Sequence, residues 1–217
     1  LRLDRQPRHI ECFDNSNLQG AHPVASCVVF RDGKPSRKEY RHFNIKTVTG
    51  ADDYASMREV VFRRYTRLMA EGAEMPDLII ADGGKGQMGV IHEVLERLGL
   101  DIPIAGLAKD DRHRTAELLC GFPPVLVGIR PTSPLFHFLA HIQEEVHRFA
   151  VSFHRQKRSK AFIHSELEQI EGVGDKTVQT LLRHFRTVEK VRAANIEELS
   201  ALVGAAKAKK IRAFFEK

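Results

Sequence analysis

The sequence predicts an α/β fold with a mixed five-stranded sheet and flanking helices, followed by a small all-α domain. Three strand-like segments come first, and a helix, a strand, a helix, a strand and a long helix follow. Charge is divided in the same way: residues 1–150 carry 20 Lys and Arg against 20 Asp and Glu, whereas residues 151–217 carry 14 against 8. A neutral body with a basic tail is typical of a polyanion-binding module attached to another domain. A solvated basic surface is the alternative.

The composition indicates a chain that folds around its own core. With 217 residues, 42% of them hydrophobic, it can hold one large domain and a small one. No apolar run approaches the roughly 18 residues of a membrane span, and the N-terminal residues show no signal-peptide pattern. Cys12, Cys27 and Cys120 are widely spaced and odd in number, which indicates neither a disulfide framework nor a zinc site. We therefore expect a cytoplasmic protein without a membrane partner.

The first three predicted strands form an antiparallel meander. Residues 10–13 form a strand that ends at Asp14, and residues 23–33 form a second strand that ends in a turn containing Asp32 and Gly33. Residues 36–46 alternate apolar and polar side chains and predict the third strand.

A helix is predicted next, from residues 49–53 to residue 71, where Gly72 ends it. Asp52 and Asp53 lie in or near its first turn, where the helix dipole favours carboxylates. Glu59 and Arg63 are spaced as an i,i+4 ion pair. Apolar side chains follow at helical spacing: Tyr54, Met57, Val61, Tyr65 and Leu68.

The central segment predicts a parallel strand–helix–strand unit. Residues 77–82 form a short buried strand, residues 83–86 a glycine loop, and an amphipathic helix then runs to Gly99 before a strand at residues 102–109. Two short peripheral strands are expected at residues 117–120 and 124–127.

Ser133 as N-cap and Pro134 at the first helical position begin a long helix. Its predicted apolar stripe is Leu135, Phe138, Leu139, Ile142, Val146, Phe149 and Phe153. Residues 155–160 read as a basic linker. We place the domain boundary there, with domains at residues 1–158 and 159–217.

Asp14 and Asp82 are the leading candidates for chemistry, since each follows a predicted buried strand. If the two strands are neighbours, the two carboxylates converge at one end of the sheet. Carboxylate oxygens suit Mg²⁺ or Mn²⁺, and a bound ion could polarise a phosphodiester. The alternative is that each Asp merely caps a strand end or a turn.

Other candidates are less specific. His147, on the polar flank of the long helix, could be a metal ligand or a general acid, although it could also be an ordinary surface histidine. Asp53 is a weaker catalytic candidate, because the helix dipole already explains an acid there. The loop at residues 83–86 lacks the full spacing of a phosphate-binding loop, but Lys85 could touch the cleaved strand. Glu11 lies on a central strand and requires a buried partner.

Residues 165–217 contain two similar helix–turn–helix units with glycine turns at residues 171–174 and 203–206. The turns resemble the helix-hairpin-helix motif, whose backbone N–H groups and helix N-termini favour phosphate. Such contacts hold the DNA backbone and do not read bases. A small protein-binding helical module is the alternative. Asn195 and Glu198 form a capping-box pattern. The candidate DNA-binding residues are Gly172, Gly174, Lys176, Gly204, Lys207 and Lys209, whereas Ala206 replaces the second glycine of the second turn.

Five segments, in this order, resemble the C-terminal half of the UvrC family, the nuclease subunit of the bacterial UvrABC nucleotide-excision-repair system: ECFDNSN, TGADDYASM, IIADGGKGQ, EEVHRFAVSFHRQKRSK and IEGVGDK. The resemblance covers essentially the whole chain. It implies a ribonuclease H-like endonuclease domain, tandem helix-hairpin-helix units, and a Mg²⁺- or Mn²⁺-dependent incision 5′ to a DNA lesion. The implied catalytic triad is Asp14, Asp82 and His147, and Asp53 matches a further acidic position.

The same resemblance implies damaged double-stranded DNA and a UvrB–DNA complex as partners. The N-terminal nuclease domain and the UvrB-binding segment of the family are absent, so the chain resembles a fragment. Asn15, Asn17 and Ala206 are its modest departures. Two alternatives stay open: a catalytically silent DNA-binding adaptor, and a nucleotide-using α/β enzyme built on Asp82 and the glycine loop. The lack of a nucleotide-binding fingerprint disfavours the second alternative.

Overall fold

The computed structural model describes residues 3, 5–16, 24–48, 50, 52–109 and 115–216, without the side chains of residues 16, 109, 115, 116 and 154–165. Contacts divide the chain into two compact units, Leu1–His154 and Arg155–Lys217. Asn17, one of the noted departures, lies outside the described residues. The predicted domain boundary at residue 158 stays a prediction.

The first unit is built on a mixed sheet with strand order β3-β2-β1-β5-β6-β7-β8, in which β4 also pairs with β2. Strand β2 is antiparallel to both β1 and β4, which confirms the meander, and β1, β5 and β6 are parallel. The strands are β1 (His9–Ser16), β2 (Val24–Arg31), β3 (Lys34–Pro35), β4 (Arg41–Asn44), β5 (Leu78–Ala81), β6 (Ile104–Lys109), β7 (Thr115–Cys120) and β8 (Val125–Val127).

The predicted mixed sheet is correct, but the number of five strands was too low, since the sheet has eight strands among the described residues. The peripheral strands β7 and β8 pair with the sheet and extend it beyond β6. The third predicted strand is divided into β3, a 3₁₀ turn at Arg37–Glu39, and β4. Alternation of apolar residues alone does not show where such a short turn interrupts a strand.

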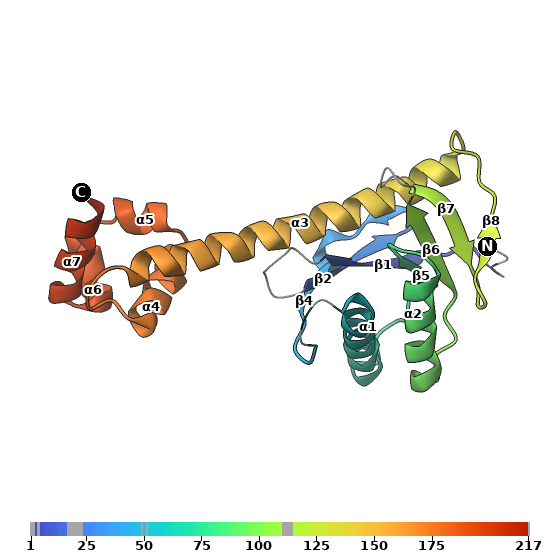
Figure 1. The fold of residues 1–217 in the computed structure, drawn as a ribbon, viewed down its shortest axis with the longest axis horizontal. Coiled ribbons are helices and arrows are strands. Elements are labelled where there is room, and N and C mark those ends of the chain that lie inside the picture. Colours follow the sequence, from blue (N-terminus) through green and yellow to red (C-terminus); the bar gives the residue numbers. More distant parts are fainter. Residues whose placement is uncertain are drawn as a thin grey trace. The chain divides into compact units, whose positions relative to one another are not determined.

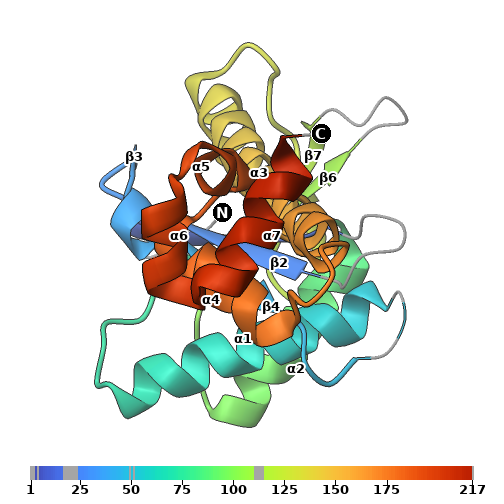
Figure 2. The same ribbon diagram turned by 90° about the vertical axis from the view of Figure 1, so that its left-hand side faces the viewer.

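Helices α1 (Asp53–Ala70) and α2 (Lys85–Leu98) cover one face of the sheet, and α3 covers the other (Figures 1 and 2). Asp52 caps α1 by accepting a hydrogen bond from Ala55 N, and Gly99 ends α2 in the left-handed conformation. Most of the predicted α1 stripe is buried, but Tyr54 is 53% exposed. Tyr54 lies against Gly86 at the start of α2, where a Cβ atom would meet its ring.

Helix α3 (Pro134–Glu168) begins at the predicted residue, where Ser133 Oγ accepts a hydrogen bond from Phe136 N. Leu139, Ile142 and Val146 are buried against the sheet, whereas Leu135 is 47% exposed in the first turn. Residues 155–160 are helical in α3, so the prediction of a linker was wrong. This segment contains no Gly or Pro, and its Arg, Gln and Lys residues are good helix formers.

The second unit packs the end of α3 with α4 (Asp175–Phe185), α5 (Val188–Ala193), α6 (Ile196–Val203) and α7 (Ala205–Phe215) around its own core. The capping box of Asn195 and Glu198 is confirmed. Helix α5, capped by Thr187, was not predicted, since six residues are too few for a clear period. In the part of the chain that the structure describes, no helix has the length and apolarity needed to cross a membrane.

Candidate functional site

The pairing of β1 with β5 places Asp14 beside Asp82. The last parallel pair of these strands is Phe13 with Ala81, and Asp82 N donates a hydrogen bond to Phe13 O at 2.9 Å. Asp14 is the next residue of β1, and Asp82 directly follows the end of β5. Strand β1 does not end at Asp14 as expected, because Asp14 still pairs with Ser26 of β2. The two acids therefore lie at the same end of two neighbouring strands.

Alternation of side chains along β1 directs Asp14 toward α3. Phe13 packs edge-on against Tyr65 of α1, so its neighbour Asp14 points to the opposite face of the sheet. There, His147 Nδ1 of α3 lies 3.8 Å from Asp14 Oδ2. One turn earlier, Gln143 Nε2 donates a hydrogen bond to Asp82 Oδ1 at 2.5 Å. Helix α3 thus contacts both carboxylates.

One oxygen of this site, Asp14 Oδ2, is buried without accepting a hydrogen bond from the described residues. Asp14 and Asp82 are each only 6% exposed, whereas the His147 side chain is 62% exposed. A buried acceptor without a partner is costly unless a cation or a donor reaches it. The carboxylates therefore fit a bound cation that also faces His147.

The described residues do not assemble a larger metal cluster. In that part of the chain, no group of three or more His, Cys, Asp and Glu side chains is arranged to hold an ion. Among the described residues, the site offers two carboxylates, with His147 at its exposed edge. This agrees with the predicted ligands Asp14 and Asp82, whose role stays a prediction.

Asp53 lies at the start of α1, on the face of the sheet opposite to α3. It is the first residue of α1, and its backbone carbonyl accepts a hydrogen bond from Asn15 Nδ2 at 2.6 Å. Asn15 follows Asp14 on β1, so its side chain points toward the α1 face. The structure therefore joins Asp53 to β1 through its main chain, and its predicted catalytic part stays a prediction.

The glycine loop after β5 is closely packed. A Cβ atom on Gly83 would overlap the Gln87 side chain, and one on Gly106 of β6 would lie 2.8 Å from Gly83 O. The backbone contact requires glycine at residue 106, whereas the flexible Gln87 side chain is able to move away from a Cβ atom at residue 83. The close fit of the loop against β6 favours the alternative of a tight strand-to-helix turn. Lys85, the first residue of α2, is exposed.

Glu11 has the buried partner that the sequence required. It accepts hydrogen bonds from Arg64 Nη2 at 2.5 Å and from Tyr65 Oη at 3.1 Å, and His9 Nε2 lies 3.4 Å away. Burial alone raises the pKa of Glu11, but hydrogen bonds from His9 and Arg64 bring it below its ordinary value. Burial together with the Glu11 charge raises the pKa of Tyr65. This ionised cluster lies on the α1 face of the sheet, opposite to the face of Asp14, and binds β1 to α1.

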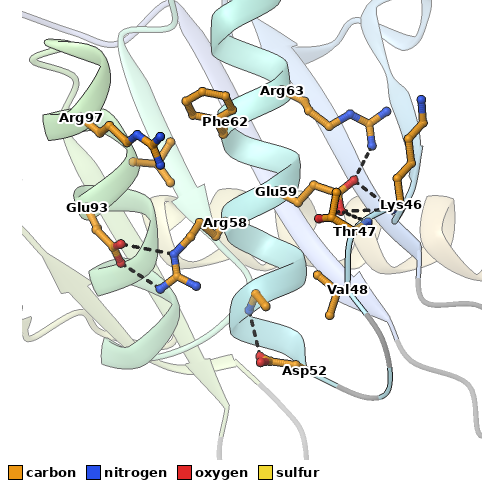
Figure 3. Close-up of a pocket in the computed structure, with 12 residues that line it drawn as sticks. Lys46, Thr47, Val48, Asp52, Arg58, Glu59, Phe62, Arg63, Glu93 and Arg97 are labelled. Atoms are coloured by element: carbon orange, nitrogen blue, oxygen red, sulfur yellow. Dashed lines mark hydrogen bonds and ion pairs between the residues drawn. The ribbon is translucent and has the colours of Figure 1, made fainter.

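A pocket of about 600 Å³ lies between α1, α2 and residues 46–48 (Figure 3). Two ion pairs border it: Arg58 with Glu93 at 2.9 Å, and Arg63 with Glu59 at 2.7 Å. Burial raises the pKa of Glu59, but hydrogen bonds from Thr47, Lys46 and Arg63 lower it to about 2. Since Asp14, Asp82 and His147 do not line this pocket, it is not the candidate active site.

Two glycine turns precede helices α4 and α7 of the second unit. Gly172 and Gly204 have φ angles of 82° and 83°, which side chains other than glycine rarely adopt. Gly174 and Gly204 are the N-caps of α4 and α7. Ala206 is the second residue of α7, so a glycine is not needed at that position for the backbone.

The lysines of the second unit differ in their contacts. Lys176 and Lys209 are exposed, as a DNA-binding role requires. Lys207 Nζ instead donates a hydrogen bond to Thr177 Oγ1 at 2.9 Å, joining the two hairpins. Lys210, which the sequence reasoning missed, places its Nζ 3.7 Å from Glu171 and over Gly172. Lys210 lies near the first glycine turn because α7 packs beside it, and the sequence around Lys210 does not indicate this packing.

Comparisons with known proteins agree with this organisation. The model of the UvrC RNase H endonuclease domain matches residues 1–151, and that of the SAM-like helix-hairpin-helix tandem matches residues 165–217. UvrABC system protein C of Bacteroides fragilis is 60% identical over 212 residues, covering 98% of this chain and 35% of the relative. The Streptococcus uberis protein of the same name is 57% identical over 203 residues, covering 93% and 34%. The chain thus spans about a third of the length of these curated relatives.

Among solved structures, Endonuclease V from Ciona intestinalis, in complex with a 23mer DNA that contains an inosine, has a TM-score of 0.37. It is 14% identical, and the match covers 51% of this chain and 52% of that one. A similarity of this size carries no argument about activity.

Proposed function

Because the chain belongs to the UvrC RNase H endonuclease domain family, we propose that it hydrolyses a DNA phosphodiester 5′ to a lesion in nucleotide excision repair. The observation that carries this proposal is the pair of buried acids under α3, Asp14 on β1 and Asp82 directly after the neighbouring strand β5. A buried pair of like charges is unfavourable unless a cation accompanies it. A catalytically silent adaptor would not need such a pair.

Asp14 and Asp82 would hold a Mg²⁺ or Mn²⁺ ion. Mg²⁺ is commonly bound by one or two carboxylates together with water and substrate phosphate oxygens, so two protein ligands are sufficient. The buried Asp14 Oδ2, which accepts no hydrogen bond from the described residues, supports this assignment. When bound, the ion would polarise the scissile phosphate and stabilise its developing negative charge.

His147 is proposed to move a proton at the leaving or attacking oxygen. Its ring lies at the exposed edge of the site, where DNA could reach it, and its Nδ1 atom lies 3.8 Å from Asp14. The nearby carboxylate orients the ring, which leaves Nε2 to serve the substrate. Asp53 and Lys85 are proposed to lie along the DNA path near this site.

The second unit is proposed to hold the DNA backbone without reading its sequence. The N–H groups of the turns at Gly172, Gly174 and Gly204 and the N-termini of α4 and α7 favour phosphate. Lys176 and Lys209 would add charge, and damaged duplex DNA in a UvrB–DNA complex is the proposed partner. Such binding should weaken steeply with salt.

Incision of a lesion-containing duplex by the UvrABC components tests this function. We expect D14N and D82N each to reduce the 5′ cut at least 100-fold, because each loses a charged ligand while keeping its size. DNA affinity should stay within about twofold of the wild type. D32N, which changes an exposed Asp of a surface turn, is the matched control and should cut normally. Normal 5′ cutting by D14N or D82N would refute the assignment.

A further inference from the structure

We propose that Gln143 is a positioning residue that fixes the Asp82 carboxylate and the register of α3 over the acid pair. The proposal rests on the proposed function of this site. Gln143 is 5% exposed, and its Nε2 atom donates to Asp82 Oδ1 at 2.5 Å and to Leu107 O of β6 at 3.3 Å. One amide group thus joins the helix to β6 and to the residue that follows β5.

The chemistry of an amide suits this place. The two N–H bonds of Gln143 lie in one plane and point in fixed directions, so two acceptors on neighbouring strands determine the orientation of the side chain. The hydrogen bond in turn restrains the plane of the Asp82 carboxylate. Because the donor is neutral, it orients the carboxylate without cancelling the negative charge that attracts a cation. A Lys or Arg at this position would compete with the ion instead.

Helix geometry extends the effect to His147. Residues 143 and 147 are separated by four positions, so they lie on the same face of α3. The hydrogen bonds from Gln143 to Asp82 and Leu107 therefore fix how α3 is rotated and positioned on the sheet. This position of the helix brings His147 Nδ1 to 3.8 Å from Asp14 Oδ2. Donors that orient carboxylate ligands commonly contribute 10- to 100-fold to metal affinity or activity.

The test compares Q143M with I142M in the whole chain. Methionine keeps the length of the side chain but removes the donor, whereas I142M changes the neighbouring buried residue, which carries no polar group. Two quantities are measured. Electron paramagnetic resonance gives the affinity of the protein for Mn²⁺ alone, and cutting assays give the Mn²⁺ concentration for half-maximal cutting. We expect Q143M to weaken both about 10- to 100-fold and I142M to match the wild type within twofold.

Equal Mn²⁺ binding and equal half-maximal concentrations for Q143M and the wild type would overturn the proposal. A wild type that neither binds Mn²⁺ nor cuts would instead contradict the proposed function itself. If Q143M fails to fold, the side-chain amide signals of Gln143 are followed by NMR in the wild type and in D82A. We expect a downfield amide proton that shifts when Mg²⁺ is added and returns upfield in D82A. A Gln143 amide signal unaffected by both changes would contradict its positioning role.

Discussion

At the scale of single residues, two acids of strand β1, Glu11 and Asp14, point to opposite faces of the sheet and differ in their contacts. Glu11 points to α1, where Arg64 and Tyr65 bind it, while Asp14 points to α3 and keeps one oxygen without a hydrogen bond. Three positions along a strand reverse the side-chain direction, which separates the structural acid from the proposed catalytic one. The sequence indicated that both were unusual. It could not identify the partner of Glu11, because the contact depends on how far α1 is rotated against the sheet.

Substitution of Glu11 by Gln is expected to destabilise the first unit by about 3 kcal/mol, because it leaves the Arg64 charge poorly compensated. The measurement is denaturant unfolding at pH 7. E71Q is the control, since Glu71 pairs with Arg67 on the surface at an exposed position, and such pairs contribute less than about 1 kcal/mol. Equal losses of stability in the two variants would contradict the structural part assigned to Glu11.

The same contribution should depend on pH in a defined direction. The pKa of Glu11 is lower in the folded protein than the ordinary value of 4.5, so its charge stabilises the fold above that value. As the pH falls through the lowered folded-state pKa, this stabilisation is lost. The difference in unfolding free energy between wild type and E11Q should therefore be largest near neutral pH and shrink below pH 4.5.

At the scale of elements, α3 connects the sequence pattern to the site. The apolar stripe that contains Ile142 and Val146 correctly predicted a helix packed on the sheet. Gln143 was missed, because glutamine in a helix is ordinary until its docked partners are known. The one feature of the sequence that could have pointed to Gln143 is its spacing of four residues from His147, which places both on one face of a helix. The helical continuation through residues 155–160 was also missed, since a cluster of charge suggested a linker where no helix breaker is present.

The helix-hairpin-helix unit carries a prediction that separates two lysines. K176M should weaken DNA binding and reduce the salt slope by about 0.9, because it removes one exposed charge that is proposed to bind phosphate. K207M should mainly lower the melting temperature, since Lys207 joins the hairpins through Thr177. Titrations of a labelled duplex at several salt concentrations measure the slopes. Identical slopes for K176M and wild type would count against the proposed phosphate contact.

At the scale of the whole molecule, the order of elements and the division of charge sufficed to predict two parts of different character. A compact α/β unit and a helical unit are present, and two family models match them in turn. The number of strands was underestimated because β7 and β8 were predicted but counted as peripheral to the sheet, and because β3, only two residues long, was merged with β4. Helix α5 was not predicted, since its six residues are too few for a clear period.

The central claim is that Asp14 and Asp82 share one divalent ion. Crystals soaked in Mn²⁺ and measured for anomalous scattering test it most directly. We predict a peak at about 2.1 Å from an oxygen of each carboxylate, at the typical distance for a small divalent ion, and its loss in D14N crystals. A fully soaked wild-type crystal with no peak between the two carboxylates would contradict the account.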